Sequence, residues 1–292
     1  MFPIVEELLS HLALERLEDN LFRGPSRDIG TPQVYGGQVL GQALRAAQYT
    51  VEGRRIHSLH AYFLRRGDFN SPIIYEVDRS RDGGSFSARR VVAIQHGCPI
   101  FTLAASFQVE ETGLEFQPSM PEVPAPGALS SVREYETRQL SQLPERFQRL
   151  MQFSAPFDLR PIDADAAGPV VDLRNCRRFW IKTVDRLPDD HDLHCAILAY
   201  VSDYGLLGTA VQPHGIHVLD GSLRMASIDH AMWFHRPYRI DEWLLCTYEA
   251  VSTSNGRGLA RGSIFREDGT LIASTIQEGL MRVCKDEAVG SR

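Results

Sequence analysis

The sequence predicts a duplicated α+β protein, in which two similar units are joined by a proline-rich connector. Three observations lead to this fold class: an alternating strand pattern, a cluster of prolines near the middle of the chain, and a constant displacement that aligns segments of the two halves. A chain of 292 residues has the length of two ordinary domains and can bury a large core without metals or disulfides.

The strand pattern is clearest over residues 101–109. Apolar and smaller or polar residues alternate there with a period of two, which is typical of a half-buried strand. Its apolar face consists of Phe101, Leu103, Ala105, Phe107 and Val109. The segment His96-Gly97-Cys98-Pro99 before it indicates a turn, and Glu267-Asp268-Gly269 indicates another before a strand over residues 271–277.

The proline cluster predicts a linker between the two units. Four prolines and a glycine remove backbone donors and disfavour both helix and sheet over residues 118–127. Apolar residues then recur at helical spacing, so we expect a helical connector from about Val132 to Phe153, with Pro144 breaking or restarting it. Pro156, Pro161 and Pro169 indicate a further irregular stretch.

The most informative pattern appears when the sequence is compared with itself at a constant shift. The shift that aligns Ser58 with Ser227 is called the repeat displacement. It aligns the segment AASFQ (104–108) with ASTIQ (273–277), and Ser58-Leu59 with Ser227-Ile228. The turns Asp82-Gly83 and Asn255-Gly256 correspond less closely. The shared order of helix, strand and turns supports a tandem repeat.

Composition and charge exclude several classes of protein. The net charge is −6 and there are no long basic runs, so a nucleic-acid binder is disfavoured. No stretch is apolar enough to span a membrane, and the first residues do not resemble a secretory signal, so we expect a cytoplasmic location. The five cysteines are widely spaced and the histidine pairs lack a third ligand, so we expect no disulfide framework, metal or cofactor.

Five segments in the same order resemble the acyl-CoA thioesterase II family. They are VYGGQVLGQAL (34–44), HSLHAYFLR (57–65), RDGGSFSARR (81–90), SIDHAMWFHRP (227–237) and ASTIQEGLMR (273–282). The resemblance implies a double hotdog fold, two fused repeats each with an antiparallel sheet wrapped around a central helix. It places the N-terminal repeat at residues 1–115, the connector at 116–165 and the C-terminal repeat, with the active site, at 166–292. We expect the central helices near residues 35–49 and 204–211.

The same resemblance implies a catalytic trio of Asp203, Ser227 and Gln277. Family members commonly have threonine at the hydroxyl position; Ser227 keeps the hydroxyl and lacks the methyl group. We expect Asp203 to lie near a helix start and to accept a proton from water that the other two side chains hold. Backbone N–H groups at such a helix start could bind the oxyanion.

The repeat supports one active site per chain. The repeat displacement relates Ser227 and Gln277 to Ser58 and Gln108, which keep the hydroxyl and the amide, but it relates Asp203 to Val34. The first half therefore has no base at this position and should be chemically silent.

Other roles for these residues stay open at this stage. Asp203 could be only a helix N-cap, or it could attack the thioester directly and form an anhydride. Asp229 shares a strand face with Ser227 and is a reserve carboxylate. His230 should point to the opposite face, so a local Ser-Asp-His triad is disfavoured.

The resemblance implies hydrolysis of fatty acyl-CoA to a free fatty acid and CoA by a homo-oligomer, a dimer or tetramer. Arginine and histidine pairs at 65–66, 89–90, 177–178 and 235–236 are candidate cations for the CoA phosphates. One alternative is a hotdog-fold enoyl-CoA hydratase, but such hydratases have a histidine five residues after the aspartate, where this chain has Gly208. The other is a non-catalytic acyl-CoA binding module.

Overall fold

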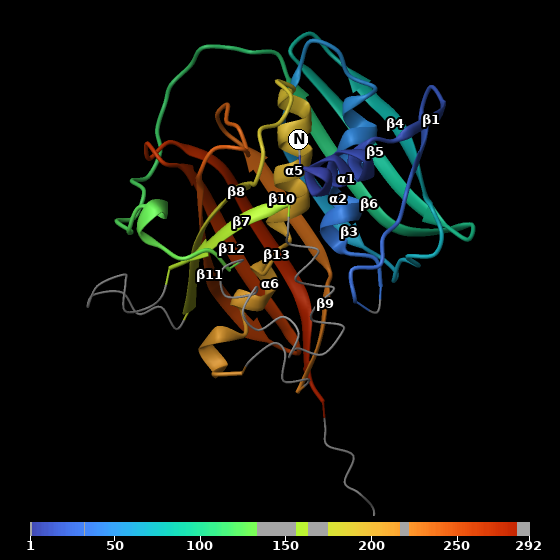
Figure 1. Ribbon diagram of the computed structural model, residues 1–292. Helices are drawn as coiled ribbons and strands as arrows, with labels where there is room; N and C mark the ends of the chain where they lie inside the picture. The colour runs from blue at the N-terminus through green and yellow to red at the C-terminus, as the bar shows by residue number, and fades with distance from the viewer. Residues whose placement is uncertain (1, 32, 133–155, 163–174, 217–221, 285–292) are drawn as a thin grey trace, which may run out of the picture.

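One antiparallel sheet forms most of the molecule (Figure 1). The computed structural model describes residues 1–292 except for 1, 32, 133–155, 163–174, 217–221 and 285–292. In the first half the strands are β1 (Glu15–Glu18), β2 (Leu21–Gly24), β3 (Arg55–Phe63), β4 (Ile73–Asp82), β5 (Phe86–Gln95) and β6 (Cys98–Gln108). In the second half they are β7 (Phe157–Pro161), β8 (Cys176–Thr183), β9 (Leu223–Ser227), β10 (Asp229–Phe234), β11 (Leu244–Ser254), β12 (Arg257–Arg266) and β13 (Leu271–Val283).

The two halves meet where β3 pairs with β10. The strand order is β1-β2-β4-β5-β6-β3-β10-β13-β12-β11-β8-β7, and β9 adds a second pairing to β13. Across the junction Ala231 lies opposite His60, and Met232 lies opposite Leu59. The sheet therefore runs without interruption from one half to the other.

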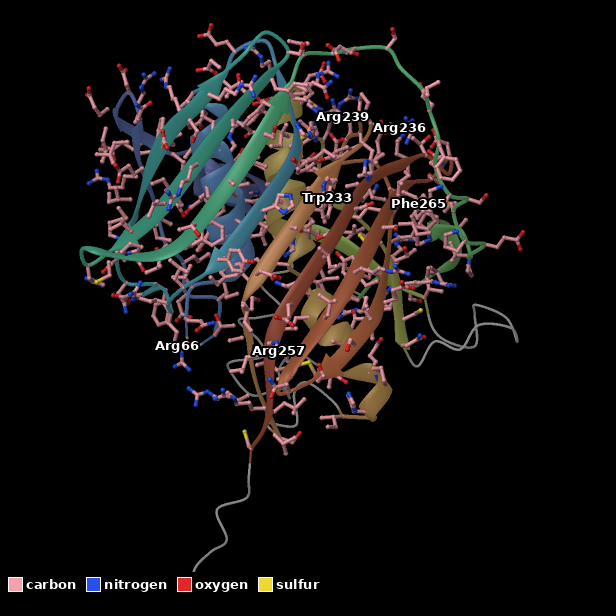
Figure 2. The ribbon with its side chains drawn as sticks, turned by 180° about the vertical axis from the view of Figure 1, so that it is seen from behind. Arg66, Trp233, Arg236, Arg239, Arg257 and Phe265 are labelled. Carbon is pink, nitrogen blue, oxygen red and sulfur yellow. The ribbon has the colours of Figure 1, made fainter. Side chains whose placement is uncertain are left out.

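Two long helices lie side by side on one face of this sheet. They are α2 (Gly36–Gln48) and α5 (His191–Ser202), and the view from behind has the sheet in front of both (Figures 1 and 2). The other helical segments within the described residues are shorter: α1 (Pro3–Leu12), α6 (Leu206–Thr209) and the 3-10 turns η1 (Pro126–Ala128) and η5 (Gln212–His214). Almost every residue of α2 and α5 is buried, because sheet and helix enclose both. Their apolar side chains form the centre of the core.

The expected first central helix is confirmed by α2, but the expected position of the second, residues 204–211, is wrong. The second central helix is α5, which begins after the N-cap Asp190 and ends at Ser202. A helix cannot continue regularly through residues 204–211, because Gly205 adopts a positive φ of 76°. The repeat displacement fails for the helix, since residues 203–222 connect α5 to β9 whereas only residues 49–54 connect α2 to β3. It is also a few residues off in the strand pairing, because Phe63 lies opposite Phe101 whereas its displaced counterpart Met232 lies opposite Thr275.

The predicted strand and turn patterns around residues 96–109 and 267–277 are confirmed. In β6 the side chains of Phe101, Leu103, Ala105 and Phe107 are buried, and β13 contains the whole of residues 271–277. His96 and Gly97 both have positive φ in the turn before β6, as Gly269 has in the turn before β13.

The region between the halves is only partly described. The expected helical connector from Val132 to Phe153 lies almost entirely outside the described residues. Of the irregular stretch expected around Pro156, Pro161 and Pro169, the first part is instead β7, which pairs with β8 at the outer edge of the sheet, and Pro169 lies outside the described residues. An edge strand tolerates proline at its end because one side of its backbone needs no ladder hydrogen bonds. No helix in the described ranges is long and apolar enough to cross a membrane.

Candidate active site

Asp203 lies between the end of one central helix and the start of the other. It is the C-cap of α5, so the alternative that it is only a helix N-cap is wrong. The helix start near which it lies is that of α2. Its Oδ2 atom instead accepts a hydrogen bond of 2.9 Å from the backbone N–H of Gly37, at the start of α2 in the other half. The carboxylate thus meets the positive end of the α2 dipole, which favours a negative charge.

This approach depends on the glycines at the start of α2. A Cβ atom added to Gly37 would collide with the Tyr200 carbonyl oxygen of α5, and one added to Gly36 would lie 2.8 Å from Oδ2 of Asp203. Further along, a Cβ on Gly41 would lie 3.0 Å from the carbonyl oxygen of Ala196. These glycines disfavour helix intrinsically, and the close approach of the two backbones compensates for this.

Gln277 and Ser227 reach the same carboxylate from the sheet. Ser227 ends β9, and Gln277 lies on β13, which pairs with β9. The Gln277 Nε2 atom donates to Asp203 Oδ1 at 2.6 Å and to Ser227 Oγ at 3.1 Å. The structure therefore brings together the three side chains that the family resemblance implies, although Asp203 and Gln277 lie far apart in the sequence.

The environment of Asp203 favours its role as a base. Burial raises the pKa of the carboxyl group, and hydrogen bonds from Gln277, the Gly37 N–H and Ser227 oppose that rise. A carboxylate with a raised pKa accepts a proton more readily near neutral pH than an ordinary aspartate does. Ser227 and Asp203 are only partly buried, whereas Gln277 is completely buried, so the hydroxyl and the carboxylate are the members of the trio nearer to solvent.

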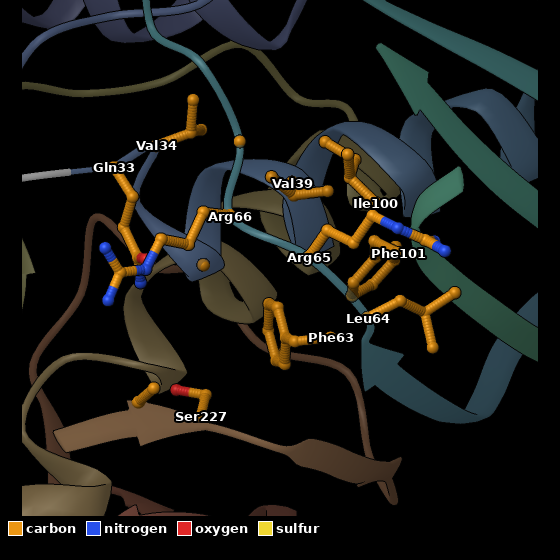
Figure 3. Close-up of a pocket in the computed structure, with 13 residues that line it drawn as sticks. Gln33, Val34, Val39, Phe63, Leu64, Arg65, Arg66, Ile100, Phe101 and Ser227 are labelled. Atoms are coloured by element: carbon orange, nitrogen blue, oxygen red, sulfur yellow. The ribbon is translucent and has the colours of Figure 1, made fainter. Parts of the chain in front are cut away.

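A cavity of about 220 Å³ opens beside the trio (Figure 3). Ser227 and Gly36 form part of its wall, and Phe63 lies between the start of α2 and the strand that carries Ser227. Arg65 and Arg66 lie at its rim. The rest of the lining is mostly apolar and comprises Gln33, Val34, Val39, Leu64, Gly67, Ile100, Phe101 and Ala226.

The two reserve residues have other contacts. The Oδ1 atom of Asp229 accepts the backbone N–H of Glu278 at 2.7 Å, and this carboxylate is not one of the hydrogen-bond partners of the trio. His230 is fully buried, and its Nε2 atom lies 2.9 Å from Ser202 Oγ and 3.1 Å from Thr275 Oγ1. Because both hydroxyls donate to backbone carbonyls, Nε2 is the donor and carries the proton.

Sequence reasoning missed this role of His230. Its two partners are the residue before Asp203 and the residue two before Gln277, so the ring connects the segments that carry the base and the amide. Burial lowers the pKa of His230 to about 3, so the ring is neutral at pH 7. The period of two in β13, which puts residues 275 and 277 on one face, is the only sequence signal that points to this contact.

The first half lacks this arrangement. By the helix ends, the equivalent of Asp203 is the C-cap of α2, Tyr49, and not Val34 as the repeat displacement suggests. Gln108, aligned with Gln277, donates instead to Glu111 at 3.0 Å on the surface. Neither possible equivalent of Asp203 in the first half is a carboxylate.

Two antiparallel units, each folded around one central helix and joined in a shared sheet, define the class of the protein as a double hotdog fold. A structure of a hotdog-fold protein from Alicyclobacillus acidocaldarius has this fold at 19% identity, with a TM-score of 0.75 over 94% of this chain and 98% of that one. The chain belongs to the acyl-CoA thioesterase II family, a family of thioester hydrolases.

The family assignment rests on matches along the whole chain. An acyl-CoA thioesterase model matches residues 148–280, and an acyl-CoA thioesterase N-terminal domain model matches residues 22–108. Acyl-CoA thioesterase 2 of Haemophilus influenzae is 42% identical over 97% of this chain and 99% of its own length, and human acyl-coenzyme A thioesterase 8 is 38% identical over 93% and 88%. The crystal structure of acyl-CoA thioesterase II TesB2 from Mycobacterium marinum is 40% identical, with a TM-score of 0.80 over 96% and 99% of the two chains.

Proposed function

We propose that the protein hydrolyses fatty acyl-CoA to a free fatty acid and CoA, with Asp203 activating the attacking water. The observation that carries the proposal is the hydrogen-bonded cluster of Asp203, Gln277 and Ser227, of which Ser227 lines the cavity. A hydrolase of this kind needs a base, a hydroxyl or amide that orients water, and donors for the developing oxyanion.

In the proposed reaction Asp203 takes a proton from water as the water oxygen bonds to the thioester carbonyl carbon. Gln277 and Gly37 hold the two carboxylate oxygens by donating to them, which fixes the direction in which the base points. The Ser227 hydroxyl, held by Gln277, orients the water. When the carbon–sulfur bond breaks, the proton passes from Asp203 to the leaving thiolate, and the carboxylate is restored.

The start of α2 is the proposed source of oxyanion stabilisation. Gly36 lines the cavity beside Ser227, and the first N–H groups of a helix point outward without partners inside the helix. The start of α2 thus has two functions in this proposal. The Gly37 N–H donates to Asp203, and the neighbouring Gly36 faces the cavity in which the carbonyl oxygen would become negatively charged.

Two alternatives are less well supported. Hotdog-fold enoyl-CoA hydratases have a histidine five residues after the aspartate, and this chain has Gly208 at that position. A non-catalytic acyl-CoA binding module would not need a buried carboxylate with a raised pKa, whose burial is unfavourable to the folded state.

A cytoplasmic location and assembly into a homo-oligomer, a dimer or tetramer, remain predictions from the sequence. Light scattering coupled to size-exclusion chromatography measures the number of copies directly. We expect a mass of at least twice the 32.8 kDa of one chain.

The decisive experiment compares wild type with Asp203→Asn on short, medium and long acyl-CoA thioesters. We expect kcat to fall by about a hundredfold or more, because general base catalysis contributes a factor of this order. In the wild type kcat/KM should fall as the pH drops through the raised pKa of Asp203, since the base must be ionised, and this acid limb should lie above the pH at which an ordinary aspartate titrates.

The control is Asp229→Asn, which removes the neighbouring carboxylate and should retain wild-type kcat. Equal turnover by wild type and Asp203→Asn would exclude Asp203 as the base. If wild type hydrolyses no acyl-CoA in the panel, the proposed function itself is wrong.

A further inference from the structure

The arginines at the cavity rim, Arg65 and Arg66, can be compared with the equivalent segment of the other repeat. β3 ends at Phe63 and continues as Leu64-Arg65-Arg66, and β10 ends at Phe234 and continues as His235-Arg236-Pro237. The two segments make equivalent backbone contacts. The N–H of Leu64 donates to the Ile100 carbonyl at 2.9 Å, and the N–H of His235 donates to the Ile272 carbonyl at 2.8 Å.

The first arginine of each segment has a structural role that both halves share. Arg65 Nη1 donates to the Pro99 carbonyl at 2.6 Å, and Arg236 Nη1 donates to the Leu271 carbonyl at 3.2 Å. Each arginine thereby ties the end of its strand to the start of the neighbouring long strand. In Figure 3 the Arg65 side chain runs toward Ile100 and Leu64, away from Ser227.

The second position differs between the halves. Arg66 belongs to the half whose cavity contains Ser227, and its counterpart is Pro237. Arg66 is exposed and extends beside Gln33 at the cavity rim (Figure 3), and Figure 2 places it at the same end of the sheet as Arg257. A proline has no charge and no backbone N–H donor, so at this position the cation is present in the half whose cavity contains Ser227 and absent from the other.

The charged residues that line the two cavities also make the cavity at Ser227 the more positive one, as the comparison of Arg66 with Pro237 does. Among the described residues that line the cavity at Ser227, two are arginines and none is acidic. The corresponding cavity in the other half, beside Phe234 and Arg236, is lined by Glu110, Glu111 and Glu115. Glu115 lies 3.8 Å from Arg236, and Glu110 lies 3.5 Å from Arg55, so these cations are compensated. The first cavity therefore attracts a polyanion more strongly than the second, in which three glutamates outnumber two arginines.

We propose that Arg66 binds a phosphate group of the CoA portion of the substrate, so that the CoA arm leaves the trio along the side of the cavity where Gln33 lies. The proposal rests on the proposed acyl-CoA hydrolysis. Acyl-CoA carries its phosphates at the end away from the thioester, and a guanidinium binds phosphate oxygens with two parallel donors. Arg66 thus favours a thioester that carries the nucleotide over one that does not. It also directs the substrate to the cavity at Ser227 and not to its counterpart in the other half.

The test compares two substrates that share one acyl group. One is the acyl-CoA, and the other is the acyl thioester of N-acetylcysteamine, which has no phosphate. For Arg66→Ala we expect KM for the acyl-CoA to rise about tenfold, the effect of losing about 1.4 kcal/mol of binding free energy, with kcat unchanged. KM for the N-acetylcysteamine thioester should stay within about twofold of wild type. Arg66→Glu should raise KM for the acyl-CoA further, and Arg66→Lys should restore part of the affinity.

Arg236→Ala is the matched control, because it removes the arginine of the equivalent segment in the half without a base. Its KM for acyl-CoA should equal that of wild type. Calorimetric binding of free CoA to Arg66→Ala gives a second readout that needs no turnover, and we expect weaker binding than in wild type.

Two results would overturn the role of Arg66 while leaving the hydrolase intact: an unchanged KM for acyl-CoA, or an equal rise in KM for both substrates, which would mean that Arg66 contacts the acyl portion. Failure of wild type to cleave either thioester would instead refute the proposed function.

Discussion

At the scale of single residues, the site combines one group made more basic by burial with another kept neutral by burial. Burial raises the pKa of Asp203, which must accept a proton, and lowers the pKa of His230, which stays a neutral donor to Ser202 and Thr275. The same physical cause acts in opposite directions because burial disfavours the charged form of each group. His230 is therefore a positioning residue, not a catalytic one.

The lowered pKa of His230 predicts a pH-dependent stability. Because the folded pKa, about 3, lies below the value of 6.5 that applies to the unfolded chain, the stabilisation is complete above pH 6.5 and is lost as the pH falls toward 3. Within that window each pH unit should reduce the free energy of unfolding by about 1.4 kcal/mol.

Thermal unfolding of wild type and His230→Asn between pH 7.5 and pH 4 would measure this effect. The difference in Tm in favour of wild type should shrink as the pH falls. A difference that stays constant with pH would contradict a neutral, buried His230.

At the scale of elements, the close contact between α2 and α5 creates the site. The start of α2 donates to Asp203 at the end of α5, and only a glycine at position 37 lets the two backbones come so near. The proposed base therefore depends on a helix that belongs to the other repeat.

Replacing Gly37 with alanine should damage both the fold and the activity. The added methyl group would press on the Tyr200 carbonyl and push the N–H away from Asp203. We expect a loss of about 1–3 kcal/mol in stability, which is usual for overpacking, and a fall of at least about tenfold in kcat.

Gly84→Ala is the matched control, since a Cβ there meets no atom within 4 Å. Urea unfolding gives the stability, and thiol release gives kcat. Wild-type kcat in Gly37→Ala would show that the helix start does not support the base.

Much of this element structure could be predicted from the sequence, because alternation in a strand is a local property. The buried face of β6 and the turns at Gly97 and Gly269 follow from residues that are neighbours in the chain. The position of α5 could not be read from the repeat, since the segment after it is longer than its counterpart after α2. The trio was accessible only through family resemblance, because its contacts join distant segments.

At the scale of the whole molecule, the two similar halves have divided the work. The second half supplies Asp203, Ser227 and Gln277, and the first supplies Gly37 and the cavity wall with Phe63 and Arg66. Neither half contains a complete site, although the pairing of β3 with β10 makes them equal partners in the sheet.

The covalent connection between the halves has a kinetic consequence. The β3–β10 junction has the form of an interface between two subunits, but the covalent connection between the halves turns their association into an intramolecular event. Specific activity should therefore stay constant when the enzyme is diluted from micromolar to picomolar concentration, whatever the fate of the oligomer. Initial rates across a dilution series measure this, and a specific activity that declines with dilution would mean that the site needs a second chain. A fused pair keeps its site assembled where a dissociating pair of single units would lose it.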